Sequence, residues 1–118
     1  MNLRQDADRI AVLAENIRAS RLELGNFTKE LVQRNPPQHV WDEAVEKING
    51  IYSACKLELY GLNELANVMN SIAHSHRDAK EINRSEILLV QLETVRRQLD
   101  AFKQELSDVL SRRNGAFN

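Results

Sequence analysis

Apolar residues recur every three or four positions through the middle third of the chain. A mean step of about 3.5 residues keeps such side chains on one side of a helix, where they face a partner helix. The pattern therefore predicts a long helix from about residue 37 to about residue 76. The positions that form its buried face are Trp41, Val45, Ile48, Tyr52, Cys55, Leu59, Leu62, Ala66, Met69 and Ala73.

Weaker copies of this spacing predict a helix on either side. A seven-residue repeat predicts the first helix, over about residues 3–34, although the polar Asp6 and Ser20 interrupt a second set of apolar positions. The repeat consists of Leu3, Ile10, Ile17, Leu24 and Leu31. The third helix, over about residues 84–113, has the same alternation of three and four. Its apolar positions are Leu88, Leu92, Val95, Leu99, Phe102, Leu106 and Val109.

Turn signals separate the three helices. Pro36 disfavours helical geometry in the residue before it, so we expect the first helix to end by Asn35. Asn35 is then placed to cap the second helix, with Gln38 completing a capping box. Asn83 and Glu86 have the same capping-box spacing and predict the start of the third helix.

Asn114-Gly115 predicts the end of the third helix and leaves a short tail over residues 114–118. Short connections make neighbouring helices antiparallel. The sequence thus predicts a single all-α domain over residues 1–118. Its architecture is an up-down-up antiparallel three-helix bundle, a coiled-coil-like rod that self-associates.

The second helix has more apolar surface than one seam requires. A further set of small and apolar residues lies beside the buried positions, and Gly50 and Gly61 in this set are points where another helix could approach closely. A helix that is apolar over so much of its circumference needs more than one neighbour. We therefore expect a partner-binding surface made of Gly50, Ile51, Ala54, Leu57, Gly61, Leu65, Val68 and Ile72.

The charge and motif content argue against several classes of function. The chain has 16 Lys and Arg residues against 17 Asp and Glu residues, whereas nucleic-acid-binding proteins usually carry a basic excess. It has no glycine-rich phosphate loop and no nucleophile-elbow motif. We therefore expect no catalytic residue, no cofactor, no metal site, no small-molecule substrate and no nucleic-acid partner. The prediction is a protein that is not an enzyme.

The cysteine content and the N-terminal segment bear on location. Cys55 is the only cysteine, so no internal disulfide can form, which fits a reducing compartment. The polar start is unlike a signal peptide. No apolar run approaches the roughly 20 residues that a membrane span requires. The sequence therefore predicts a cytoplasmic protein that does not enter a membrane.

Reactive side chains concentrate only between His74 and Glu81, where three interpretations compete. One is a metal site of His74, Asp78 and Glu81, which share a face if this segment is helical. A second is phosphotransfer on His76, since the size and helical character resemble histidine phosphotransfer domains, whose motif is similar to His-x-x-Lys-Gly. Here Lys80 lies one residue too far, and Glu81 replaces the glycine. The third, which we favour, is a solvated and capped link between helices.

The function expected from the sequence is therefore a protein–protein interaction module, such as an adaptor, a chaperone-like protein or a structural bundle. In general character the chain resembles small helical secretion-system proteins and their chaperones. The chain also resembles the WXG-type helical hairpins in having a tryptophan, Trp41, near an inter-helix turn. Asp42-Glu43 follows Trp41, so the Trp-x-Gly turn of those proteins is missing. The alternative is a signalling domain that transfers a phosphoryl group through His76.

Overall fold

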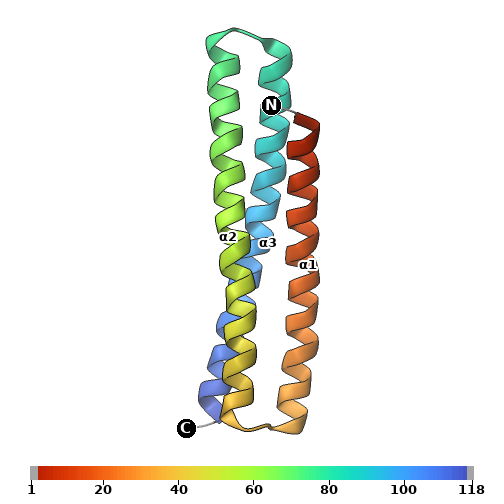
Figure 1. Cartoon of the computed structure of the whole chain (residues 1–118), viewed down its shortest axis with the longest axis vertical. Coiled ribbons are helices and arrows are strands. Elements are labelled where there is room, and N and C mark those ends of the chain that lie inside the picture. Colours follow the sequence, from red (N-terminus) through yellow and green to blue (C-terminus); the bar gives the residue numbers. More distant parts are fainter. Residues whose placement is uncertain (1–2, 117–118) are drawn as a thin grey trace.

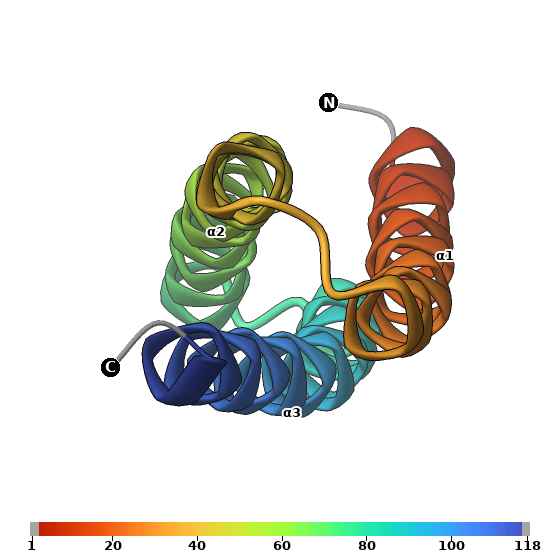
Figure 2. The same ribbon diagram turned by 90° about the horizontal axis from the view of Figure 1, so that it is seen from below.

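Three long helices make up the whole of the computed structural model, which describes residues 3–116. They are α1 (Leu3–Arg34), α2 (Gln38–Ser75) and α3 (Ala79–Ala116). Figure 1 shows them side by side in up-down-up order, in a rod of 60 × 21 × 17 Å. Seen end-on in Figure 2, the three helices occupy the corners of a triangle. The all-α three-helix bundle expected from the sequence is confirmed.

The core runs the length of the rod along the three predicted seams. In α1 and α2 its buried apolar residues are Ile10, Leu13, Ile17, Leu24, Leu31, Trp41, Ile48, Cys55, Leu59, Leu62, Ala66 and Ala73. In α3 they are Leu88, Leu92, Val95, Leu99, Phe102, Leu106 and Val109, the seven positions that the spacing predicts. Phe102 is fully buried and meets Tyr52 edge to face, with ring centroids 5.7 Å apart. The side chain of Leu3, the first residue of the repeat, lies outside the described side chains.

Among the described side chains, one charged residue belongs to this core. Asp6, which interrupts the apolar series of α1, is only 6% exposed. Its Oδ1 lies 4.0 Å from the guanidinium of Arg9. Its Oδ2 has no hydrogen-bond partner among the residues that the structure describes. Burial of a carboxylate oxygen without a hydrogen-bond donor lowers the stability of the folded state. Asp6 therefore destabilises the start of α1.

The first turn differs from its prediction. Asn35 does not cap α2; it closes α1, with a left-handed φ of 46° and its N–H bonded to the carbonyl of Leu31 at 2.9 Å. Asparagine is one of the few residues that adopt this conformation readily. Pro37 is the N-cap of α2 and makes no side-chain capping bond, so the expected capping box with Gln38 is wrong.

The second turn is tighter than predicted, and α3 begins at Ala79 rather than near residue 84. Arg77 has a φ of 51° and bonds the carbonyl of His74, while the N–H of Asp78 bonds that of Ala73. This is the Schellman arrangement that ends many helices. Asp78 then accepts a hydrogen bond from the N–H of Glu81 at 3.2 Å, so it caps α3.

The two ends of α3 therefore correct two sequence predictions. Asn83 and Glu86 lie inside the helix, because Asp78 supplies the cap earlier in the chain. At the other end α3 continues through Asn114-Gly115 to Ala116, and neither residue has a positive φ. A glycine favours a helix stop only when the chain turns there. Residues 117 and 118 of the expected tail lie outside the described part of the chain.

Candidate partner-binding surface

The expected second apolar stripe of α2 lies on the side of that helix facing away from the bundle core. We call this surface the outer face of α2 and define it by Gly50, Ala54, Leu57, Gly61, Leu65, Val68 and Ile72. Leu57 is 74% exposed, Val68 51% and Ile72 54%. Gly50, Ala54 and Gly61 are also exposed, and Leu65 is half-buried. Leu57, Val68 and Ile72 are therefore largely uncovered by α1 and α3. Ala54 borders the groove toward α1, and Leu65 lines a small void together with Asp6 and Ile10 of α1.

Two grooves flanking α2 show why this face stays open. The groove toward α3 contains Tyr52, Lys56 and Leu59 of α2. The groove toward α1 contains Ile51 and Ala54, facing α1 residues that include Ala19. The α2 residues that lie between the two grooves face the core of the bundle. The residues on the opposite side of α2 are covered by neither α1 nor α3. Ile51, which the sequence placed in the stripe, packs partly against the core and borders the groove toward α1 instead.

The glycines of α2 are not contact points within the bundle. A Cβ atom added at Gly50 or Gly61 meets nothing within 4 Å. Each glycine in a helix interior costs about 1 kcal/mol relative to alanine. Neither α1 nor α3 packs closely enough over these glycines to require the absence of a side chain. The space over them is therefore open to a helix of another chain.

The outer face of α2 repeats every eleven residues. Gly50, Gly61 and Ile72 are spaced in this way, and so are the pairs Ala54 with Leu65 and Leu57 with Val68. Eleven residues make three turns at about 3.67 residues per turn, so the stripe runs almost straight along the helix. A neighbouring helix could follow it from Gly50 to Ile72, a length of about 33 Å at 1.5 Å per residue.

The cluster between His74 and Glu81 forms the connection between α2 and α3. His76 is the exposed C-cap of α2, and Lys80 lies in the first turn of α3, so the turn separates them onto two helices. In a phosphotransfer motif the histidine and lysine share one helix. Phosphotransfer through His76 stays a hypothesis, tested by whether acetyl phosphate gives an acid-labile adduct that His76→Ala abolishes.

The metal interpretation of the same segment has no geometric support. Asp78 is engaged as the cap of α3, and His74 lies 3.8 Å from Glu86. Among residues 3–116, no group of three or more His, Cys, Asp or Glu side chains is arranged to hold a metal ion. The segment forms a capped link between α2 and α3.

Cys55 is a core residue rather than a reactive one. Its side chain is buried between α2 and the rest of the bundle. Burial raises the pKa of the thiol, and the negative charge of Glu58 adds to the effect. A raised pKa keeps the group as a thiol, which is a poor nucleophile.

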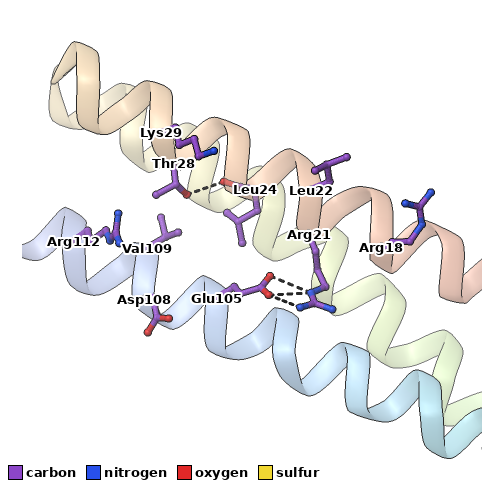
Figure 3. A pocket seen from close by; sticks show the side chains of 11 residues that line it. Arg18, Arg21, Leu22, Leu24, Thr28, Lys29, Glu105, Asp108, Val109 and Arg112 are labelled. Atoms are coloured by element: carbon purple, nitrogen blue, oxygen red, sulfur yellow. Dashed lines mark hydrogen bonds and ion pairs between the residues drawn. The ribbon is translucent and has the colours of Figure 1, made fainter.

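A groove between α1 and α3 was not expected from the sequence. It has a volume of about 560 Å³ and is lined by Arg21, Thr28, Glu105, Asp108 and other residues (Figure 3). The guanidinium of Arg21 donates to Glu105 at 2.6 and 3.0 Å, which raises the pKa of Arg21. The pair spans 84 positions in the chain, too far for a local pattern to reveal. The two side chains neutralise each other and join α1 to α3.

Comparison with known proteins does not add to these observations. The chain matches no protein-family model, no curated protein and no solved structure.

No helix within residues 3–116 contains a stretch that is both long and apolar enough to cross a bilayer.

Proposed function

We propose that this protein is a non-enzymatic interaction module whose outer face of α2 binds a helix of a protein partner. The observation that carries the proposal is the exposure of Leu57, Val68 and Ile72 along one line of a helix whose opposite side already forms the core. Scattered apolar residues are ordinary on protein surfaces, but contiguous ones are typical of interaction sites.

The shape of the surface favours a helix as the bound element. Helix-in-groove recognition uses apolar anchors at steps of three, four and seven residues. The outer face of α2 supplies anchors at Leu65, Val68 and Ile72, in steps of three and four residues, and Leu57 lies eight residues before Leu65. The open space over Gly61 lets a partner backbone come closer than it could over a larger side chain. An adaptor, a chaperone-like protein and a structural bundle would each use such a surface.

A reducing compartment such as the cytoplasm suits this role. Cys55 is buried and its pKa is raised, so it remains a thiol that supports the core. The nearly balanced charge gives the surface no general attraction for nucleic acid. Binding specificity then comes from the fit of apolar side chains.

Site-specific photocrosslinking in cells that express the chain tests the proposal. A benzophenone side chain in place of Leu57 should form adducts with a polypeptide, and one in place of the exposed Ser107 on α3 should not. Adding Val68→Glu to the Leu57 probe should abolish the adducts while leaving the helical circular dichroism unchanged. Equal labelling from both positions, or no adduct from Leu57, would contradict the assignment.

A further inference from the structure

Two Asn-Gly dipeptides occur in the chain, and the fold places them in different surroundings. Asn49-Gly50 lies in the middle of α2, and Asn114-Gly115 lies in the last turn of α3. All four residues are exposed to solvent. An asparagine followed by glycine is prone to attack on its side chain by the next backbone nitrogen, because glycine has no Cβ atom to hinder the approach. The two pairs therefore share the same local chemistry and differ in how a helix holds them.

We propose that Asn114 is a site of spontaneous deamidation and that the fold protects Asn49 from the same reaction. The backbone nitrogen of Gly115 attacks Cγ of Asn114 and gives up its proton to solvent. The new N–Cγ bond closes a five-membered succinimide ring, and the bond from Cγ to Nδ2 breaks with release of ammonia. Water is the only co-reactant. It opens the ring at one of the two carbonyl groups, which gives aspartate or isoaspartate.

Helical geometry prevents this ring closure. In an α-helix each N–H is bonded to the carbonyl four residues back, and ψ is about −42°. The attack requires a free N–H and a ψ value that brings the backbone nitrogen against the side-chain carbon. Each Asn-Gly pair must therefore leave its helix before it reacts, so its rate follows the population of the locally opened form.

Local opening is much easier at Asn114 than at Asn49. Helix α3 ends at Ala116, so Asn114 leaves the helix whenever the last turn frays. Helix ends open with free energies near zero. Asn49 lies well inside α2 and directly follows Ile48, a core residue that is only 6% exposed. Opening at Asn49 therefore disturbs the core, and its opened form is much rarer.

Arg113 supports the same assignment. Its Nη1 donates a hydrogen bond to Oδ1 of Asn114 at 3.0 Å, and its Nε binds Asp42 of α2. A donor on this oxygen stabilises the negative charge that develops there when Cγ is attacked. Arg113 and Asn114 are neighbours in the chain, so this bond does not depend on the helix. Asn49 has no hydrogen-bond donor on its side chain among the described residues.

The product changes the contact that joins the end of α3 to the start of α2. The reaction replaces a neutral amide by a carboxylate in the last turn of α3. A negative charge there lies at the negative end of the helix dipole. It also competes with Asp42 for the guanidinium of Arg113. Deamidation of Asn114 therefore weakens the link between Arg113 and Asp42.

Peptide mass spectrometry of the full chain after incubation at mildly alkaline pH tests the proposal. The peptide with Asn114 should acquire the mass of an amide-to-carboxyl exchange at least about tenfold faster than the peptide with Asn49. Gly115→Ala should slow the reaction at Asn114 by about tenfold or more, because the added methyl group hinders the attack and favours the helix.

Gly50→Ala is the matched control and should leave the rate at Asn114 unchanged. A Cβ atom added at either glycine meets nothing within 4 Å, so both variants keep the fold. Equal rates at Asn114 and Asn49 in the folded chain, or no modification of Asn114, would overturn the proposal.

Urea separates the effect of the fold from the effect of the neighbouring residues. Both helices are lost in the unfolded chain, so the rate at Asn49 should rise to approach the rate at Asn114. If Asn49 stays unreactive in urea, its sequence neighbours protect it rather than α2, and the proposed protection by the fold is wrong. Asn114 lies on α3 and not on the outer face of α2, so these results are independent of the proposed function.

Discussion

Replacement of Asp6 by leucine should stabilise the protein, although it removes a charged residue from the start of a helix. Asp6 is 6% exposed, and its Oδ2 has no hydrogen-bond partner among the described residues. It lies at a small void of about 10 Å³ whose other walls include Ile10, Leu62 and Leu88. Leucine has the same number of side-chain heavy atoms, and all of its surface would be apolar at this site.

The expected gain in the free energy of unfolding is the difference between the stabilising and the destabilising effects of the substitution. Burying a leucine side chain contributes about 2 kcal/mol, and removing an unbonded buried polar atom contributes about 1–3 kcal/mol. The change forfeits the attraction of a carboxylate in the first helical turn, about 0.3–1 kcal/mol. It also forfeits the long contact with Arg9, at most about 1 kcal/mol. The sum of these terms is a net stabilisation of about 1–5 kcal/mol.

Urea unfolding followed by the fluorescence of Trp41 measures this gain. Trp41 is the only tryptophan and is buried in the core, so unfolding exposes it. With a slope of about 2 kcal/mol per molar, a gain of 2 kcal/mol moves the midpoint upward by about 1 M. Asp8→Leu, at an exposed position in the same turn of α1, is the control and should change little. A lower midpoint for Asp6→Leu would refute the reasoning.

Three further substitutions test other parts of the structure. Phe102→Ala should cost about 3–5 kcal/mol of unfolding free energy, because Phe102 is fully buried against Tyr52; a loss under 1 kcal/mol would contradict its place in the core. Arg77→Gly should raise the melting temperature, because it relieves a left-handed residue at a cost of about 1 kcal/mol. The hydrogen bond from Arg96 lowers the pKa of Glu93, so this pair stabilises the fold at neutral pH and the effect is lost as pH falls through the lowered pKa. Glu93→Gln should therefore flatten the acid limb of a stability–pH curve, and an unchanged limb would argue against the pair.

The sequence predicted the buried seams well, because each is a local periodic signal. All seven predicted core positions of α3 are buried, since a three-four alternation leaves one possible inward side. The helix ends were less predictable. Asn83 and Glu86 have the same capping-box spacing that starts many helices, but Asp78 caps α3 first, and a sequence pattern does not rank two competing caps.

The excess of apolar residues on α2 indicates where along the chain the candidate surface lies. It does not indicate which neighbouring helices surround that surface. Whether α1 or α3 covers a given residue depends on where those helices lie around α2. Ile51 illustrates this dependence, because it is next to the stripe in sequence but packs partly against the core. The ion pair between Arg21 and Glu105 was out of reach for the same reason.

The difference in helix length has a consequence for motion in the rod. α1 has 32 residues, whereas α2 and α3 have 38 each, and the turn joining α2 to α3 rises beyond the first turn of α1 (Figure 1). Among the described residues, only α2 and α3 pack together there (Figure 1). Near this end, a hydrogen bond from Asn70 to Ser85 joins the two helices. Fewer buried apolar contacts mean a smaller free energy of local opening. Amide hydrogen exchange should therefore form a gradient along α2 and α3, fastest at this end and slowest beside Phe102.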